Sequence, residues 1–317
     1  MFYQWKKLFN PEIFQGKYKK RNYFEGWYYK LFDSTFMHPL IIIPGISMNQ
    51  SDSHSFIQII YQGTEVDYIR YDLTDFRYSE KEFALWIGDN YFTKNQINLH
   101  ILSNKISIQG KLSFYNRIGF PKTLYHPGIM GPFSYLPIME CYHGIVNIHH
   151  QISGKLMIAG ESINYDKGYG YIEKDWGTSF PKRWIWFQSS HFPKGKVTVQ
   201  FSVAEIPFLG TSFEGFLSIF RYKNNIILFA TYTGARIRYF YKSDTYLWIT
   251  IQDLRFCLEI GVVAADGIEL KAPIKGIMKR TILETTFATI RVRLSTRQGK
   301  LLYEGNGKNT GLEIVGY

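Results

Sequence analysis

Turn-forming residues divide almost the whole chain into short segments. From Tyr23 onward, short runs of apolar or alternating apolar and polar residues are separated by Gly, Asn, Asp or Pro. The breaks recur about every 8–12 residues, a spacing typical of all-β proteins. Helical periodicity is scarce, and only residues 1–20 suggest a short helix or an irregular arm. The pattern therefore predicts an all-β fold.

The pattern predicts about eighteen strands. The expected strands are residues 23–32, 55–61, 66–73, 83–87, 91–99, 105–114, 144–150, 155–163, 183–192, 197–205, 213–222, 225–233, 245–252, 256–263, 281–287, 290–294, 300–304 and 311–315. A single small barrel closes at about eight strands, so we expect two antiparallel barrels or sandwiches in tandem. We place the first domain at residues 1–168 and the second at residues 169–317. Residues 120–137, rich in Pro and Gly, are either a linker or a lid loop inside the first domain.

The chain is basic, with a net charge of +11 and a pI near 9.3. Basic residues concentrate at residues 1–22 and 271–300. Neither cluster carries a nucleic-acid-binding motif, so we expect no nucleic-acid partner and interpret both as solvated basic faces. For residues 1–22 we also expect weak attraction to an anionic membrane surface.

The two cysteines, Cys141 and Cys257, are far apart in the sequence, which argues against a disulfide scaffold and fits a reducing compartment. The N-terminus lacks the apolar core of a signal peptide, and the longest apolar run, residues 39–43, is too short to span a bilayer. We expect a cytoplasmic protein, with peripheral membrane attachment as an open alternative.

Several common catalytic motifs are absent from the sequence: GxGxxG, the Walker loop, GxSxG and HExxH. Nucleotide-dependent chemistry, serine hydrolysis and zinc proteolysis therefore lack support. Any catalysis is expected to be acid–base work without a cofactor or a metal.

The segment "GYIEKDWGTSFPKRWIWFQ" places acids at strand spacing in aromatic surroundings. Glu173 and Asp175 are two residues apart and share a strand face with Tyr171. Carboxylates in such a setting are costly when buried and ordinary when exposed. Asp175 is also close enough in sequence to pair with Lys182 or Arg183.

The same segment continues into a second strand. Trp184, Trp186 and Gln188 alternate along it, so they share one face and supply an aromatic wall with one polar group.

A third group of aromatic residues surrounds an acid in "YFEGWYYK". Alternation puts Glu25 on one strand face with Tyr23, Trp27 and Tyr29. Two readings stay open: Glu25 is a carboxyl group inside an aromatic cavity, or it pairs with a basic residue or closes a barrel end.

The segment "MECYHGIVNIHH" raises the question of a metal site. His143, His149 and Cys141 could share a face, but no further ligand stands at a recognised spacing. Hydrogen-bonded strand histidines are the favoured reading. Glu140, which enters this strand after the Pro-rich loop, is a further candidate acid.

Together, "NPEIFQG", "YFEGWYYK", "MECYHG", "GYIEKDWGTSFPKRWIWFQ", "LKAP" and "GLEIVG" resemble the tocopherol cyclase family. The matches run in the family's order over nearly the whole chain. The resemblance implies two lipocalin-like β-barrels, a lipophilic substrate, and cofactor-free cyclisation of a prenylated quinol. The family's plant members carry Asn at the position of Asp175, which favours Glu173 over Asp175 as the acid.

The sequence therefore predicts an acid-catalysed cyclase or hydratase of a prenylated quinol or another isoprenoid, with a non-catalytic lipid carrier as the alternative. Alkene protonation needs a carboxylic acid in an apolar site and aromatic faces beside the cation. Glu173 is the first choice of acid, shielded from water in an aromatic-lined cavity; Glu25 and Glu140 are alternates, and Asp175 is the candidate most expected to be structural. The expected substrate-binding residues are Trp27, Tyr29, Tyr171, Trp176, Trp184, Trp186 and Gln188.

Overall fold

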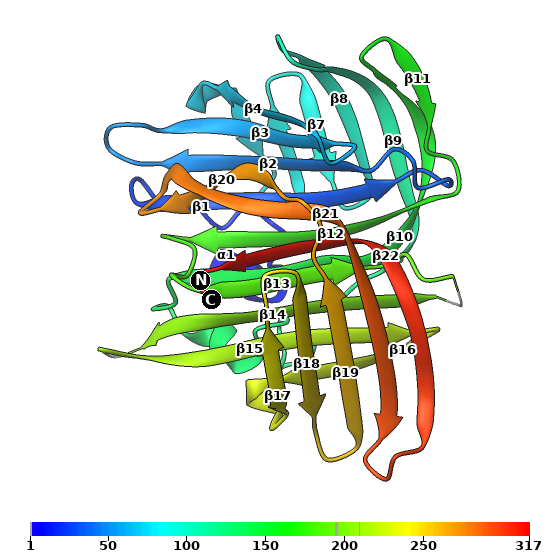
Figure 1. Ribbon diagram of the computed structural model, residues 1–317. Helices are drawn as coiled ribbons and strands as arrows, with labels where there is room; N and C mark the ends of the chain where they lie inside the picture. Colours follow the sequence, from blue (N-terminus) through cyan, green and yellow to red (C-terminus); the bar gives the residue numbers. More distant parts are fainter. Residues whose placement is uncertain (1, 194–195, 209) are drawn as a thin grey trace. The chain divides into compact units, whose positions relative to one another are not determined.

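The computed structural model describes residues 2–193, 196–208 and 210–317, and it consists almost entirely of β-strands (Figure 1). The chain forms two compact units. Unit 1 contains Met1–Phe180 and Leu270–Thr281, and unit 2 contains Pro181–Glu269 and Ile282–Tyr317. The sequence-based division after residue 168 falls at the first residue of strand β12 (Gly168–Gly177), twelve residues before the end of the first segment of unit 1.

Unit 1 is built on a twelve-stranded sheet. Its elements are α1 (Phe2–Phe9), β1 (Tyr23–Phe32), β2 (Leu40–Met48), β3 (His54–Tyr61), β4 (Glu65–Tyr71), η1 (Leu73–Asp75), β5 (Phe76–Tyr78), β6 (Ala84–Ile87), β7 (Asn90–Thr93), β8 (Gln96–Leu102), β9 (Ser107–Ile118), η2 (Gly131–Tyr135), β10 (Cys141–Ile158), β11 (Glu161–Asn164) and β12 (Gly168–Gly177). The strand order is β4-β3-β2-β1-β12-β10-β9-β8-β7-β6-β5, with β11 beside β10. The sheet curves into a nearly closed barrel (Figure 1).

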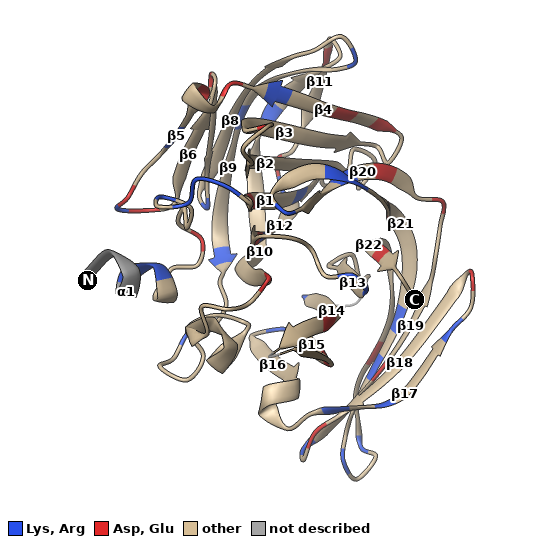
Figure 2. Ribbon diagram, turned by 90° about the vertical axis from the view of Figure 1, so that its left-hand side faces the viewer, with Lys and Arg blue, Asp and Glu red and all other residues tan. Residues whose placement is uncertain are grey.

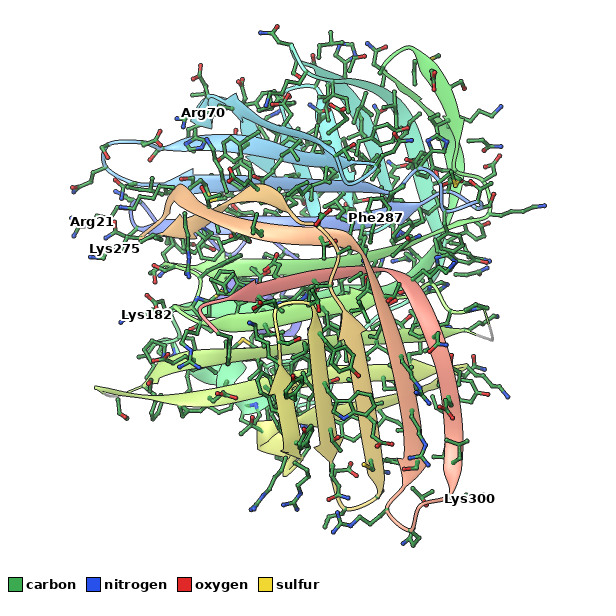
Figure 3. The ribbon with its side chains drawn as sticks, viewed as in Figure 1. Arg21, Arg70, Lys182, Lys275, Phe287 and Lys300 are labelled. Atoms are coloured by element: carbon green, nitrogen blue, oxygen red, sulfur yellow. The ribbon has the colours of Figure 1, made fainter. Side chains whose placement is uncertain are left out.

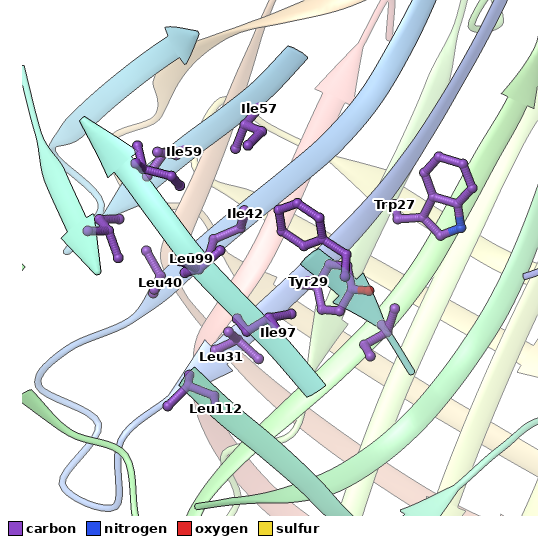
Figure 4. Packing of buried hydrophobic residues seen from close by; sticks show 14 of the residues in the cluster. Trp27, Tyr29, Leu31, Leu40, Ile42, Ile57, Ile59, Ile97, Leu99 and Leu112 are labelled. Atoms are coloured by element: carbon purple, nitrogen blue, oxygen red, sulfur yellow. The ribbon is translucent and has the colours of Figure 1, made fainter. Parts of the chain in front are cut away.

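The interior of this barrel is an apolar core formed by alternate residues of its strands. Trp27, Tyr29 and Leu31 of β1 point into it together with aliphatic residues from the strands around them (Figure 4). All three are fully buried. Because a strand alternates its side chains between two faces, the residues between them lie on the other face of the sheet.

The segment that follows α1 packs onto the sheet of unit 1 and is largely buried. Ile13 and Phe14 belong to the apolar core, and the Phe14 ring lies 4.3 Å from that of Tyr78. The returning segment Leu270–Thr281 is fixed by side chains of β2 and β3: Ser47 donates a hydrogen bond to the carbonyl oxygen of Gly276 at 2.5 Å, and the Gln58 side chain accepts one from the Lys271 amide at 2.9 Å.

The second sheet has ten strands and lies in unit 2, except for residues 270–274 and 277–281, which belong to unit 1. Its elements are β13 (Trp184–Ser189), β14 (Val197–Phe208), β15 (Thr211–Tyr222), β16 (Asn225–Ala230), η3 (Thr231–Thr233), β17 (Arg236–Lys242), β18 (Tyr246–Gln252), β19 (Phe256–Val263), β20 (Ile268–Ile274), β21 (Ile277–Thr296) and β22 (Leu301–Val315). The order is β16-β15-β14-β13-β22-β21-β19-β18-β17, with β20 beside β21. Its own apolar core includes Phe187, Val199, Phe201 and Phe220.

The predicted all-β fold with two antiparallel sheets is confirmed. Neighbouring strands run antiparallel wherever the structure describes their register. The short N-terminal helix that residues 1–20 suggested is α1. Among the helices that the structure describes, none is long and apolar enough to cross a membrane.

Candidate active site

The two faces of β12 carry different chemistry. Alternation places Tyr171, Glu173 and Asp175 on one face and Ile172, Lys174 and Trp176 on the other. The face with Ile172 and Trp176 contacts the apolar core of unit 1. β12 pairs with β1 on one side and with β10 on the other, so side chains from three strands meet on each face.

On the core face, Lys174 and Glu25 form a fully buried ion pair. The Glu25 carboxylate also accepts hydrogen bonds from the backbone amides of Gln15 at 2.8 Å and Gly16 at 3.0 Å, and from the Tyr23 hydroxyl at 2.5 Å. Every one of these donors lies in the N-terminal segment or at the start of β1, so the carboxylate ties that segment to the sheet.

The ammonium group of Lys174 is surrounded by protein groups, as the Glu25 carboxylate is. It donates to the carbonyl oxygens of Pro11 at 2.7 Å and Ile13 at 2.6 Å. It lies 4.7 Å from the ring centre of Trp27 and 4.8 Å from that of Trp176. Burial lowers the pKa of Lys174 to about 8, although Glu25 opposes that shift.

These contacts decide between the two readings of Glu25. The structure gives the second: Glu25 pairs with a basic residue, and that residue is Lys174 of the neighbouring strand β12. Trp27 and Tyr29, expected to bind substrate, are core residues whose polar atoms donate to backbone carbonyl oxygens, Trp27 to Glu12 at 2.8 Å and Tyr29 to Thr93 at 3.0 Å. Trp176 stacks on Tyr142 with ring centres 5.4 Å apart.

On the opposite face of β12, His143 lies between two carboxylates. Its Nδ1 atom is 2.9 Å from Oδ1 of Asp175, and its Nε2 atom is 3.6 Å from Oε2 of Glu173. The Tyr171 hydroxyl donates to the same Glu173 oxygen at 2.5 Å. β10 brings His143 directly opposite Asp175 in the sheet register, which explains how residues far apart in sequence meet.

The cluster is shielded from water. The Glu173 side chain is 5% exposed and that of His143 13% exposed, whereas Asp175 is 24% exposed. The Nε2 atom of His143 is buried and has no hydrogen-bond partner among the described residues. The expected burial of Glu173 is thus observed, while the aromatic-lined cavity that it was expected to face stays a prediction.

Two pKa shifts follow from this arrangement. Burial favours the neutral form of His143, but the carboxylates of Asp175 and Glu173 outweigh it and raise the pKa of His143 to about 9. Burial, reinforced by Glu173, raises the pKa of the Tyr171 hydroxyl well above its usual value. At neutral pH the cluster therefore contains an imidazolium between two carboxyl groups and a neutral phenol.

The partner that the structure gives to Asp175 is His143, and not the Lys182 or Arg183 suggested by sequence proximity. His143 itself had been interpreted as a hydrogen-bonded strand histidine or as part of a metal site with His149 and Cys141. The ligand atoms that the structure instead brings within 4.8 Å of one another are those of His143, Glu173 and Asp175, a set that could hold a metal ion.

Glu140 is half-buried and precedes β10. Its described contacts use its backbone: the carbonyl oxygen accepts a hydrogen bond from the Thr178 amide at 2.8 Å. This close approach depends on Gly177, which has φ +150°, since a Cβ atom there would lie 2.2 Å from the Glu140 carbonyl oxygen. The glycine of the "DWG" motif therefore joins the end of β12 to the start of β10, beside the His143 cluster.

The remaining predicted binding residues belong to unit 2. Trp184, Trp186 and Gln188 alternate on β13, as expected, and all three are buried. The Trp184 indole donates to the Glu313 carboxylate at 2.6 Å, and the Gln188 amide donates to the Ser190 hydroxyl at 2.8 Å.

Unit 1 also shows a pocket of about 190 Å³ at β10, lined in part by Glu12, Lys94, Arg117 and Lys122. Its charged lining differs from the aromatic cavity expected from the sequence. Glu12 bridges Lys94 at 3.4 Å and Lys122 at 2.9 Å, and these lysines help lower the pKa of its carboxyl group although burial opposes them.

Comparison with known proteins gives concordant results. A model of the tocopherol cyclase-like family matches residues 105–316. The chain is 25% identical over 173 residues to "Tocopherol cyclase, chloroplastic" of Zea mays, an alignment that covers 50% of this chain and 35% of the maize protein. The match thus spans about a third of the length of that relative.

Two solved structures are similar over most of their length. A putative AttH from Nitrosomonas europaea has a TM-score of 0.52 at 12% identity, with 93% of this chain and 92% of that chain covered. CghA, solved with Sch210972, has a TM-score of 0.59 at 9% identity, with 92% of this chain and 88% of that chain covered. At these identities the likeness concerns the fold alone, and it confirms the expected two-barrel, lipocalin-like architecture.

Proposed function

Because the chain belongs to the tocopherol cyclase-like family, we propose that it catalyses the cofactor-free addition of an oxygen nucleophile to a double bond of an isoprenoid chain. The substrate class is a lipophilic prenylated quinol, and the product is the cyclised chromanol or, with water as nucleophile, the hydrated chain. The observation that carries the proposal is the buried cluster in which His143 lies between Glu173 and Asp175.

Glu173 is the proton donor in this mechanism. Its carboxyl group transfers a proton to the less substituted carbon of a trisubstituted alkene, leaving a tertiary cation. The phenolic oxygen of the quinol adds to that cation and forms the new carbon–oxygen bond. The phenolic proton then returns to the Glu173 carboxylate, so the cycle closes without net gain or loss of protons or electrons.

His143 and Asp175 hold a proton beside the donor. The imidazolium directs Nε2 towards Glu173, and Asp175 holds the opposite ring nitrogen and so fixes the ring orientation. An imidazolium whose pKa is about 9 stays protonated at neutral pH, so a proton is held beside Glu173 and can move to its carboxyl group as that group protonates the alkene. The hydrogen bond from Tyr171 orients the carboxyl oxygen that receives it.

Turnover of a prenylated hydroquinone by the purified chain in D2O tests the proposal. We expect a chromanol that carries one deuterium at the former alkene carbon. Glu173→Gln should lose this activity, whereas Glu161→Gln, which alters an exposed acid on β11, should retain it. Binding of the hydroquinone without turnover would contradict the enzymatic proposal and favour the carrier.

A further inference from the structure

The strands β13, β14 and β15 of unit 2 carry buried residues on both faces, although only one face meets the apolar core. Val199, Phe201 and Phe220 point into that core. The alternate residues on the same strands, among them Gln200 on β14 and Arg221 on β15, lie on the opposite face and are also buried. The chemistry proposed for Glu173 makes no use of this second face.

Gln200 and Arg221 are diagonal neighbours on it. Thr198 is opposite Arg221 in the register of β14 and β15, and Gln200 is opposite Ile219. Gln200 is 1% exposed and Arg221 2% exposed. The long side chains of Gln200 and Arg221 can therefore reach the same region of this face.

Each of these side chains has buried polar atoms that no described residue satisfies. Among the residues that the structure describes, both amide atoms of Gln200 and the Nε and Nη1 atoms of Arg221 are buried without a hydrogen-bond partner. Buried polar groups in native proteins are nearly always paired, and a buried guanidinium without a counter-charge is especially costly. Two such groups side by side point to a polar partner supplied from outside the chain.

The residues beside them define the rest of the site. Thr198, which is opposite Arg221 in the register, is a neutral residue whose hydroxyl accepts a hydrogen bond from the Ser190 hydroxyl at 3.3 Å. Ile219 and Trp186 share the same face and are buried apolar groups. A cation and an amide at the border of an apolar surface fit a molecule with a charged end and a hydrocarbon body.

We propose that Arg221 and Gln200 bind the carboxylate of an amphiphilic ligand. The planar guanidinium can hold both carboxylate oxygens through two parallel hydrogen bonds. The Gln200 amide can donate a further hydrogen bond to one of them, and the hydrocarbon chain continues over Ile219 and Trp186. The site is independent of the acid–base chemistry assigned to Glu173.

Binding of dodecanoate and dodecanol to the full chain tests the proposal, since the two probes share a hydrocarbon chain and differ in charge. We expect the wild type to bind the carboxylate with a Kd about tenfold or more below that of the alcohol. Arg221→Met keeps the apolar stem and should remove this preference, and Gln200→Leu should reduce it. Arg236→Met, which removes an exposed arginine on β17, should leave it unchanged.

The thermal stability of Arg221→Met in the absence of ligand gives a second, separate readout. A guanidinium retained for a ligand costs stability, so its replacement by Met should leave Tm unchanged or raise it. Equal affinity of the wild type for both probes, a carboxylate preference that survives in Arg221→Met, or failure of that variant to fold would overturn the proposal. Glu173→Gln should keep the preference whether or not turnover is lost, so the two proposals fail separately.

Discussion

Glu173 and Lys174 are consecutive residues of β12, yet their side chains lie in very different surroundings. On the core face, Lys174 and Glu25 satisfy each other and are closed in by backbone groups of the N-terminal segment. On the opposite face, Glu173 and Asp175 both lie beside His143. The Nε2 atom of His143 is 3.6 Å from the Glu173 carboxyl group and has no hydrogen-bond partner among the described residues.

This difference shows how a carboxyl group that stabilises the sheet can be distinguished from one that can take part in catalysis. A buried carboxylate with all its acceptor sites occupied has no capacity left for a substrate, and its role is to hold elements together. A buried carboxyl group beside an incompletely bonded imidazole retains a route for a proton. The first description fits Glu25 and the second fits Glu173.

The sharpest test exchanges the two acids for their amides. Glu173→Gln should lower turnover about 10²- to 10⁴-fold, the usual contribution of a general acid, while the fold persists because the amide oxygen still accepts the Tyr171 hydrogen bond. Glu25→Gln should mainly lower the stability, since Lys174 then lacks its counter-charge. Steady-state turnover and thermal unfolding of both variants measure this contrast. Full activity of Glu173→Gln would contradict the catalytic role proposed for Glu173.

Removal of the cation should affect stability almost as strongly. Lys174→Met leaves the Glu25 carboxylate buried without its counter-charge, which costs about 3–5 kcal/mol of unfolding free energy. The double variant Glu25→Gln/Lys174→Met removes both charges and should recover a large part of that loss. Urea unfolding provides the measurement, and a single variant as stable as the wild type would show that the pair does not anchor the N-terminal segment.

The pH dependence distinguishes the His143 side of the sheet. The folded-state pKa of His143, about 9, lies above the usual value of a histidine side chain, 6.5. The stability that protonated His143 contributes is therefore fully present below about pH 6.5 and is lost as the pH rises through about 9. Activity that needs the imidazolium should fall over the same alkaline range.

Asp175→Asn weakens the charge that holds the proton on His143, so the alkaline limb of the activity profile should move to lower pH by about one unit. A pH–rate profile compared with that of the wild type checks the shift. Asp166→Asn alters an exposed acid in unit 1 and serves as the control. An unchanged alkaline limb in Asp175→Asn would show that His143 takes no part in the proton transfer.

The sequence predicted elements best where side chains alternate locally. The expected strand 23–32 has the bounds of β1. β2 was not expected because its residues "LIIIPGISM" are buried on nearly every position and include Pro44, which hides the period of two. β10, β21 and β22 each run through a site that was interpreted as a turn or a gap, because the sequence does not reveal the irregular pairings that let a long strand continue.

The candidate site was predictable in part. Strand spacing identified Glu173, Tyr171 and Asp175 as residues of one face, and the structure keeps them together with His143. The partners could not be predicted, because Glu25 and Lys174, like His143 and Asp175, meet only through strand pairing between distant segments. Asp175 was assigned to nearby basic residues for the same reason: proximity in sequence was the available guide to pairing.

The smallest expected effect concerns the N-terminal segment that encloses the Glu25 pair. Its first lysines have partners in the protein: Lys7 donates to the Gln15 carbonyl oxygen at 2.5 Å, and Lys17 pairs with Glu80 at 2.5 Å. Lys19, Lys20 and Arg21 are exposed. Figure 2 shows the basic residues of α1 and of the loop before β1, and Arg21 lies at the same edge of unit 1 as Lys275 (Figure 3).

We propose that this exposed edge attracts anionic membranes, from which a lipophilic substrate would be collected. Each basic residue near such a surface contributes about 1 kcal/mol, and salt screens the attraction. Arg21→Gln should therefore weaken sedimentation with anionic liposomes about fivefold at low salt, with little effect on neutral liposomes. Lys17→Gln, which removes a lysine already paired with Glu80, should have a smaller effect. Equal sedimentation of the wild type with anionic and neutral liposomes would show that the segment only closes the core face around Glu25 and Lys174.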